Sequence, residues 1–213
     1  MKATKNQETL TLRERHKLNR RDAIVRAAEK IMADKGYARA TMDEIAAEAE
    51  VGVATVYKHF GTKANILEAI IRPSLELSFT RAEEAIAHPP MDPAVAMVAL
   101  IDNYRYLRNG WKERRLLRVL SVLEAEEVAV LKIMTGEANA RAIQQIRDLL
   151  LVLRGRGDIR SGLSVDDAAF VIFCVFNQHY ELFISDENLV FDKLYTDLRR
   201  RIRLLMASWI AKQ

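Results

Sequence analysis

The sequence is poor in the residues that cross-link, break or bend a chain. Its 213 residues include one cysteine, four prolines and eight glycines. The single cysteine, Cys174, excludes an intrachain disulfide and a cysteine-based zinc site, and this usage suits a reducing cytoplasm. Few breakers and an apolar content of 50% exclude a disordered chain and favour a helical, globular one.

Targeting segments and long apolar runs are also missing. The N-terminal residues MKATKNQETLTLRERHK are polar and lack the apolar stretch of a secretory signal. The longest apolar run, residues 168–176, is shorter than a bilayer-spanning helix. We therefore expect a cytoplasmic protein with no membrane partner.

Histidine is too sparse and too scattered for a catalytic or metal site. The four histidines, at positions 16, 59, 88 and 179, show no metal-ligand or triad spacing. Cys174 and His179 are five residues apart, so they do not share a helix face well. The sequence therefore predicts no enzyme, no metal and no cofactor.

Positive charge is concentrated at one end of the chain. The net charge is +4, and residues 1–72 hold 14 basic and 10 acidic side chains, whereas the remainder is neutral. Within that third, residues 1–26 contain eight basic and three acidic side chains. A basic end on a neutral body is typical of phosphate binding, although a solvated basic tail gives the same count.

Short helices follow one another after residue 22. Apolar residues recur every three or four positions from Ile24 to Met32, and Gly36 ends that helix. Thr41 and Glu44 form a capping-box pattern that starts a second helix, about 42–49. A break at 50–52 leads to a third helix, about 53–59, and a fourth opens at 61–62. Two short helices joined by a tight turn behind a supporting helix form a helix-turn-helix, which predicts DNA binding.

The rest of the chain predicts a larger helical body. Pro73 indicates a kink or a stop in the fourth helix, and residues 88–93 form the clearest loop. Long helices are expected at 94–108, 112–124, 127–154, 165–184 and 191–211. The predicted fold is all-α with about nine helices. Its expected parts are a basic arm (1–19), a helix-turn-helix domain (20–72) and a helical ligand-binding and dimerisation domain (73–213).

The spaced residues of the helix-turn-helix resemble the TetR family of regulators. The resemblance covers residues 20–71 and rests on several motifs in order across four helices. They are Gly36-Tyr37, Thr41, Ile45-Ala46, Ala49, Val51, Thr55-Val56-Tyr57-Lys58-His59-Phe60 and Lys63. Three positions depart from the family pattern. Glu50 stands where the family usually has the turn glycine, and Gly52 stands where it usually has the serine N-cap of the recognition helix. Ala54 replaces a common small residue or glycine.

The resemblance and the chemistry of the side chains together nominate DNA contacts. Tyr57 and His59 resemble the family's phosphate-contacting pair, and Lys63 resembles its phosphate lysine. A hydroxyl at a helix start suits phosphate, and the early recognition helix can meet base edges. The predicted DNA-binding residues are Thr41, Val53, Thr55, Tyr57, Lys58, His59, Lys63, Arg20 and Arg21, with Arg13, Arg15 and Lys17 as further arm residues. Val56 and Phe60 are expected in the core.

The resemblance also implies a dimer and an inducer cavity in the body. In the family the last two helices pair with those of a second copy, and the apolar excess of 165–184 and the stripe in 191–211 are consistent with this. The predicted dimer residues are Phe176, Phe183, Leu194, Leu198, Ile202, Leu205 and Trp209. The predicted ligand-binding residues are Tyr104, Arg108, Trp111, Phe173, Asn177, Tyr180 and Glu181. The run Arg199–Arg203 is interpreted as a solvated face.

The resulting functional hypothesis is a TetR-like repressor. It would bind a near-palindromic DNA operator as a homodimer and be released by a small-molecule inducer. The alternative is a helical homodimeric interaction protein in which Glu50 and Gly52 have weakened or abolished DNA binding. Activation instead of repression also stays open, since the sequence does not tell whether a bound regulator raises or lowers transcription.

Overall fold

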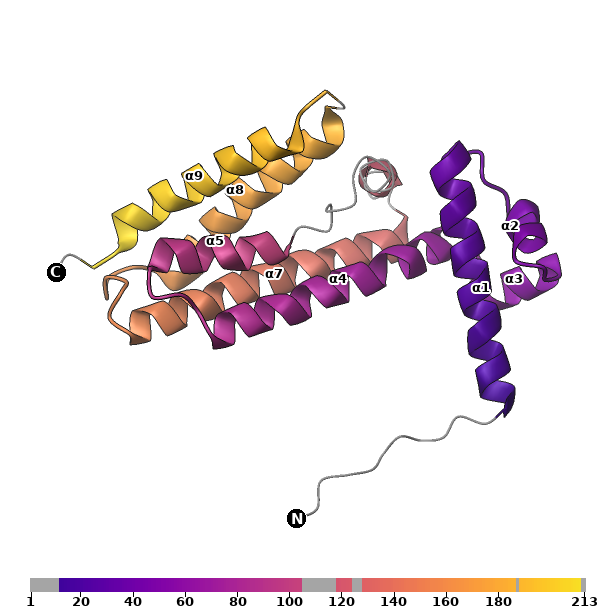
Figure 1. The fold of residues 1–213 in the computed structure, drawn as a ribbon, viewed down its shortest axis with the longest axis horizontal. Helices are drawn as coiled ribbons and strands as arrows, with labels where there is room; N and C mark the ends of the chain where they lie inside the picture. The colour runs from indigo at the N-terminus through magenta and orange to yellow at the C-terminus, as the bar shows by residue number, and fades with distance from the viewer. Residues whose placement is uncertain (1–11, 105–117, 124–127, 187, 212–213) are drawn as a thin grey trace, which may run out of the picture. The chain divides into compact units, whose positions relative to one another are not determined.

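A computed structural model describes residues 12–104, 118–123, 128–186 and 188–211, and within these ranges the protein is helical (Figure 1). One isolated bridge, between Ile159 and Ile210, is the extent of β-pairing in the described ranges. The all-α prediction is confirmed. The helices with defined bounds are α1 (Leu12–Lys35), α2 (Met42–Glu48), α3 (Val53–Phe60), α4 (Lys63–Ala87), α5 (Pro93–Asn103), α7 (Ala129–Gly155), α8 (Val165–Ser185) and α9 (Phe191–Trp209).

The chain divides into two compact units, Met1–Ile70 and Ile71–Gln213, so the division falls inside α4. Pro73 lies within this helix, which runs on to Ala87. Of the two alternatives predicted at Pro73, a kink or a stop, the stop is excluded. The helix tolerates a residue that cannot donate to the carbonyl one turn back because its other hydrogen bonds and its buried side chains remain.

The first unit packs three helices around a small apolar core. Ile24, Ala28 and Met32 of α1, Ile45 of α2 and Val56 of α3 are all buried, and α2 packs against both α1 and α3. The capping box that starts α2 is confirmed. The Thr41 hydroxyl oxygen accepts from the Glu44 amide at 3.2 Å, and the Thr41 amide donates to the Glu44 carboxylate at 3.1 Å.

The second unit is a layered bundle in which α7 packs on α8, α8 on α9, and α5 on α9 and α7. Residues 118–123 add a short helical stretch. At the end of the bundle, backbone bonds tie α9 to the loop after α7: the Arg160 amide donates to the Trp209 carbonyl, and the Ala211 amide to the Asp158 carbonyl. These bonds fix the end of α9 without a longer sheet.

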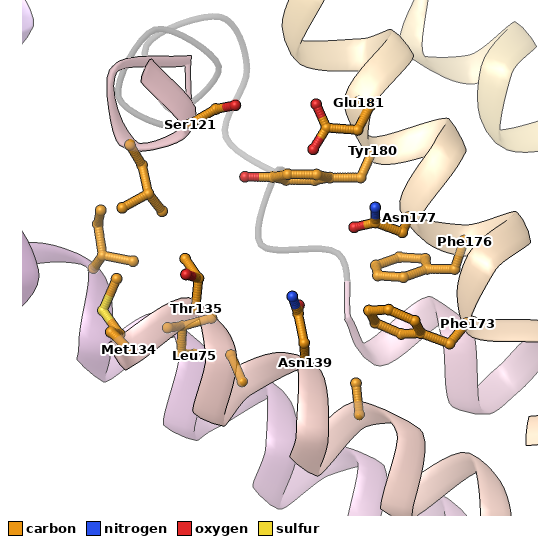
Figure 2. Close-up of a pocket in the computed structure, with 14 residues that line it drawn as sticks. Leu75, Ser121, Met134, Thr135, Asn139, Phe173, Phe176, Asn177, Tyr180 and Glu181 are labelled. Carbon is orange, nitrogen blue, oxygen red and sulfur yellow. The ribbon is translucent and has the colours of Figure 1, made fainter. Parts of the chain in front are cut away.

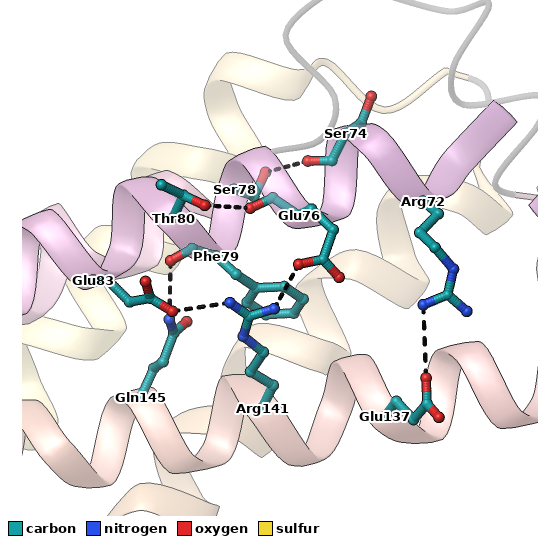
Figure 3. Close-up of polar contacts among 10 residues, drawn as sticks. All are labelled: Arg72, Ser74, Glu76, Ser78, Phe79, Thr80, Glu83, Glu137, Arg141 and Gln145. Carbon is teal, nitrogen blue, oxygen red and sulfur yellow. Dashed lines mark hydrogen bonds and ion pairs between the residues drawn. The ribbon is translucent and has the colours of Figure 1, made fainter. Parts of the chain in front are cut away.

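Helices α4 and α7 run side by side, and buried polar groups join them (Figure 3). The Gln145 amide donates to the Phe79 carbonyl at 2.9 Å, and the Tyr104 hydroxyl donates to the Gln145 side-chain oxygen at 3.1 Å. On the surface, Arg141 spans Glu76 and Glu83 and stacks on the Phe79 ring. The exposed ion pairs are each worth about 0–1 kcal/mol, so the buried glutamine carries more of the specificity of this contact.

Helix α8 is apolar over most of its length. Its 21 residues are long and apolar enough to cross a bilayer by length and composition alone, which the short uninterrupted run at 168–176 did not suggest. In the fold one face of α8 is buried against its neighbours. That face includes Ala169, Ile172 and Phe183. This burial is what the core helix of a bundle requires.

Candidate functional site

The recognition helix α3 turns one face inward and the other to solvent. Val56 and Phe60 are buried, as expected. Tyr57 is 51% exposed, Lys58 is exposed, and Val53, Thr55 and His59 are half-buried. The residues predicted to contact DNA on α3 therefore lie on its accessible side, where they can reach a groove.

A cluster of cations surrounds His59 where the start of α1 meets the end of α3. Lys17, Arg20 and Arg21 of α1 and Lys58 of α3 all act on this imidazole. Partial burial, followed by the repulsion from these four cations, lowers the pKa of His59. The Arg21 guanidinium stacks on the Phe60 ring at 5.2 Å, which fixes its position. Such a cluster favours a polyanion. The side chains of Arg13 and Arg15 lie outside the described residues.

The turn between α2 and α3 is a Schellman motif with an unusual residue. The Val51 amide donates to the Ala46 carbonyl, and the Glu50 amide to the Ala47 carbonyl. Glu50 takes a φ of 54°, the one positive φ at a non-glycine residue in the described chain. This is the position that the family pattern gives to glycine, and a side chain there is strained.

The N-cap of α3 has no side-chain donor or acceptor. Gly52 occupies it in extended conformation and makes no side-chain cap hydrogen bond. A Cβ added at Gly52 would meet only the Thr55 hydroxyl at 3.9 Å, an ordinary contact. The space would thus accept the serine that is usual in the family. Steric crowding therefore does not explain why glycine occupies the N-cap.

Lys63, predicted to bind a phosphate, is held by backbone carbonyls in the DNA-free structure. Its ammonium group donates to the carbonyls of Tyr37 (2.7 Å), Ala38 (3.3 Å) and Ala40 (2.9 Å), and it lies over the Tyr37 ring at 4.4 Å. Partial burial lowers the pKa of Lys63. All three ammonium protons are used by the loop between α1 and α2, which leaves none for a phosphate. We therefore reassign Lys63, in the DNA-free protein, as a residue that positions the helix-turn-helix, and its phosphate contact in a DNA complex stays a prediction.

The second unit contains a cavity of about 200 Å³ among α4, α7, α8 and the stretch 118–123 (Figure 2). Phe173, Asn177, Tyr180 and Glu181, four of the predicted ligand residues, line it. Tyr104 does not: it is buried behind the cavity, with its ring 5.8 Å from that of Phe176. Arg108 and Trp111 lie outside the described residues.

Helix α7 contributes lining residues that the sequence did not reveal. Met134, Thr135, Ala138, Asn139 and Ala142 face the cavity. They recur at spacings of three and four, so they share one face of the helix. In the sequence, the only indication of this lining is a run of small and polar residues beside an apolar stripe. The same pattern is typical of a solvated helix face, so it does not identify a cavity wall.

Five of the seven residues predicted for the dimer interface are buried in the chain's own core. Phe183, Leu194, Leu198, Ile202 and Trp209 are buried within the single chain, Ile202 completely. Phe176 lines the cavity, and Leu205 is half-buried. Side chains buried in this way have little surface to offer a partner, whereas Phe176 and Leu205 keep some, and the dimer contacts stay a prediction. The exposed apolar residues of the two helices are others: Phe170, Val171, Leu182 and Leu204.

Replacing Lys63 separates a positioning role from a phosphate contact. Lys63→Met should lower the free energy of unfolding by about 1–3 kcal/mol, because three carbonyls lose their donor, and should weaken DNA binding as a result. The matched variant Lys58→Met, at an exposed site, should weaken DNA binding while changing stability by less than about 0.5 kcal/mol. Urea unfolding and fluorescence anisotropy measure the two effects. Unchanged stability in Lys63→Met would contradict the reassignment.

Replacing Glu50 separates backbone strain from charge. Glu50→Gly should stabilise the protein by about 1 kcal/mol, because glycine adopts a positive φ without a Cβ clash. Glu50→Gln keeps the Cβ and removes only the charge, so it should leave stability unchanged. Thermal unfolding of the three proteins provides the measurement. Equal stabilisation by both variants would show that charge, not strain, is the cost at this turn.

Comparisons with known proteins agree with this arrangement. Residues 24–70 match the profile of the bacterial regulatory proteins, tetR family. The HTH-type transcriptional regulator HbdR of Aromatoleum sp. (strain CIB) is 36% identical over 73 residues, which are 33% of this chain and 32% of that protein. The chain thus matches about a third of this relative's length.

Solved structures extend the likeness in fold to nearly the whole chain. A TetR-family transcriptional regulator from Mesorhizobium loti superposes with a TM-score of 0.71 at 18% identity, over 92% of this chain and 98% of that one. SmeT in complex with triclosan superposes with a TM-score of 0.72 at 21% identity, over 91% of this chain and 92% of SmeT. NalD, the secondary repressor of the MexAB-OprM multidrug efflux pump in Pseudomonas aeruginosa, superposes with a TM-score of 0.65 at 20% identity. The superposition covers 93% of this chain and 100% of NalD. Residues 24–70 thus match the helix-turn-helix of the tetR family of bacterial regulatory proteins, and nearly the whole chain shares its fold with TetR-family transcriptional regulators.

Proposed function

We propose that this regulator is a cytoplasmic repressor that binds a near-palindromic DNA operator as a homodimer and is released by a small-molecule inducer. The observation that carries the proposal is the accessible side of α3. Tyr57 and Lys58 project there, next to the cations that surround His59. An exposed helix flanked by cations suits a major groove bordered by phosphates.

The proposed DNA contacts divide into two kinds. Val53, Thr55 and Lys58 would meet base edges or thymine methyl groups. Tyr57, His59, Arg20 and Arg21 would hold phosphates. Thr41 would join the second group: its oxygen already accepts from the Glu44 amide, and its hydroxyl proton is available to a phosphate.

The proposed dimer uses the outer faces of α8 and α9. Phe170 and Leu204 are 57% and 71% exposed, and Val171, Cys174 and Leu182 continue the apolar face of α8. Apolar residues gathered on one face favour burial against a partner. A second copy would supply the second recognition helix that a palindromic site demands.

The proposed inducer site is the cavity of the second unit. SmeT, which shares the fold, has been solved in complex with triclosan, and both SmeT and NalD are named as repressors of multidrug efflux pumps. By analogy, a small molecule would lie among Phe173, Asn177, Tyr180 and Glu181, with Tyr104 supporting the wall from behind. A ligand that prefers the DNA-free conformation lowers DNA affinity by mass action.

Selection from a random DNA library tests the proposal directly. We expect enrichment of a near-palindrome bound by two protomers, with an affinity that falls steeply as salt rises. Tyr57→Ala and Lys58→Ala should abolish the enrichment. If folded, dimeric protein enriches no sequence, direct DNA reading fails, and the helical interaction protein becomes the better interpretation.

Charge placed on the outer face of α8 tests the dimer. Phe170→Glu should convert the protein to a monomer and weaken operator binding at least tenfold, since one recognition helix then binds alone. Leu77→Glu is the matched control, because Leu77 is an exposed apolar residue of α4, away from α8 and α9. Analytical ultracentrifugation gives the oligomeric state. A dimeric Phe170→Glu variant would contradict this choice of face.

Operator affinity should depend on pH through His59. Partial burial, followed by repulsion from the neighbouring cations, lowers the pKa of His59 in the free protein, and a bound phosphate would offset the repulsion and raise it. Binding would then take up a proton, so affinity should rise as the pH falls through the pKa of His59 in the complex, and should be flat at higher pH, where His59 is neutral in both states. His59→Gln should remove this rise. Anisotropy titrations at constant ionic strength measure it, and an affinity that falls with acid would contradict the contact.

A further inference from the structure

The walls of the cavity in the second unit have a distinctive chemistry. The rings of Phe173 and Phe176 form one end, and the carboxamides of Asn139 (α7) and Asn177 (α8) lie beside them on two different helices (Figure 2). Ser121, Tyr180 and Glu181 lie at the other end. The cavity thus offers an aromatic surface next to a pair of amides.

The two carboxamides have no hydrogen-bond partner among the described residues, whereas a third polar group of the wall does. The Thr135 hydroxyl donates to the Leu131 carbonyl at 3.0 Å, so it is satisfied within α7. Asn139 is exposed and Asn177 half-buried, so water reaches both in the cavity, and each carboxamide has two donors and two acceptor sites available to a ligand. A ligand group that both donates and accepts would satisfy Asn139 and Asn177 together.

The charge of the described wall disfavours an anion. Among the described lining residues there is no lysine, arginine or histidine, and the one charged side chain is Glu181. An anion would give up its hydration without gaining a countercharge from these residues. Glu181 is exposed, so water screens its attraction for a cation deeper in the cavity. The balance favours an uncharged guest.

We infer that the cavity binds an uncharged aromatic molecule of one or two rings, whose polar group, such as a carboxamide or a phenol, both donates and accepts a hydrogen bond. Asn139 and Asn177 hold that group, and Phe173 and Phe176 pack against the rings. The volume of about 200 Å³ lies below the roughly 300–1,000 Å³ of drug-sized sites, which sets the limit on ring number. The inference deepens the proposed function, on which it rests for the consequence of binding.

Three probes on one skeleton test the chemistry: naphthalene-2-carboxamide, naphthalene-2-carboxylate and 2-naphthylmethylammonium. Isothermal titration calorimetry with the full-length protein, without DNA, gives their affinities at neutral pH. We expect the carboxamide to bind at least tenfold more tightly than either ion. Equal or tighter binding of the carboxylate or of the ammonium overturns the inference, as does the failure of all three to bind.

Substitutions locate the binding to the two amides. Asn139→Leu and Asn177→Leu should each weaken binding of the carboxamide about tenfold, since leucine keeps the volume and removes the hydrogen bonds. Gln144→Leu is the matched control on α7, because its side chain bonds Asp148 and does not line the cavity. It should leave the affinity unchanged. Unchanged binding in both asparagine variants overturns the assignment.

A change of preference provides a test that does not depend on loss of binding. Asn177→Asp has nearly the same shape and adds a negative charge, so it should bind the ammonium probe more tightly and the carboxamide more weakly than the unmodified protein does. If Asn177→Asp leaves the relative affinities of the two probes unchanged, the assignment is overturned. This result does not depend on whether the leucine variants fold.

Release from DNA is measured separately with the selected operator. Carboxamide binding that the asparagine variants weaken supports the inference, whether or not the operator complex dissociates. A complex that persists at saturating carboxamide counts against the inducer step of the proposed function alone. Failure of the probes to bind, with operator binding intact, counts against the ligand chemistry alone.

Discussion

One ammonium group holds the helix-turn-helix in shape. The loop between α1 and α2 leaves three carbonyl oxygens pointing to one place, and Lys63, the first residue of α4, satisfies all of them. The loop sets where α2 begins, α2 sets the turn, and the turn sets the direction of α3. The accessible side of α3 and the cations around His59 depend on this arrangement. A point charge with three donors suits the task better than a planar guanidinium would.

Local patterns in the sequence predicted local structure well. The capping box at Thr41, the break at 50–52 and the inward positions of Val56 and Phe60 follow from periodicity and cap chemistry over a few residues. The identities of these residues fix backbone geometry directly. The all-α fold and the helix-turn-helix that matches the tetR family could therefore be predicted from the sequence.

The sequence did not predict which element or group each side chain would contact in the folded protein. The stripe containing Leu198 and Ile202 shows that α9 has an apolar face, but periodicity does not tell whether α5 and α8 or a second chain covers it. A lysine that binds phosphate and one that binds carbonyls look identical in sequence, as Lys63 demonstrates. Asn139 resembles a solvated residue until the position of α8 places it in a cavity wall. Long-range packing decides all three cases.

Pro73 gives α4 a property that its length conceals. The helix is continuous from Lys63 to Ala87, yet two residues beyond the division at Ile71 its backbone lacks one amide proton. Bending a helix elsewhere stretches or breaks a hydrogen bond, whereas here that bond is already missing. Helix α4 thus has a point of low bending stiffness at Pro73, provided by a single imino acid in an otherwise continuous helix.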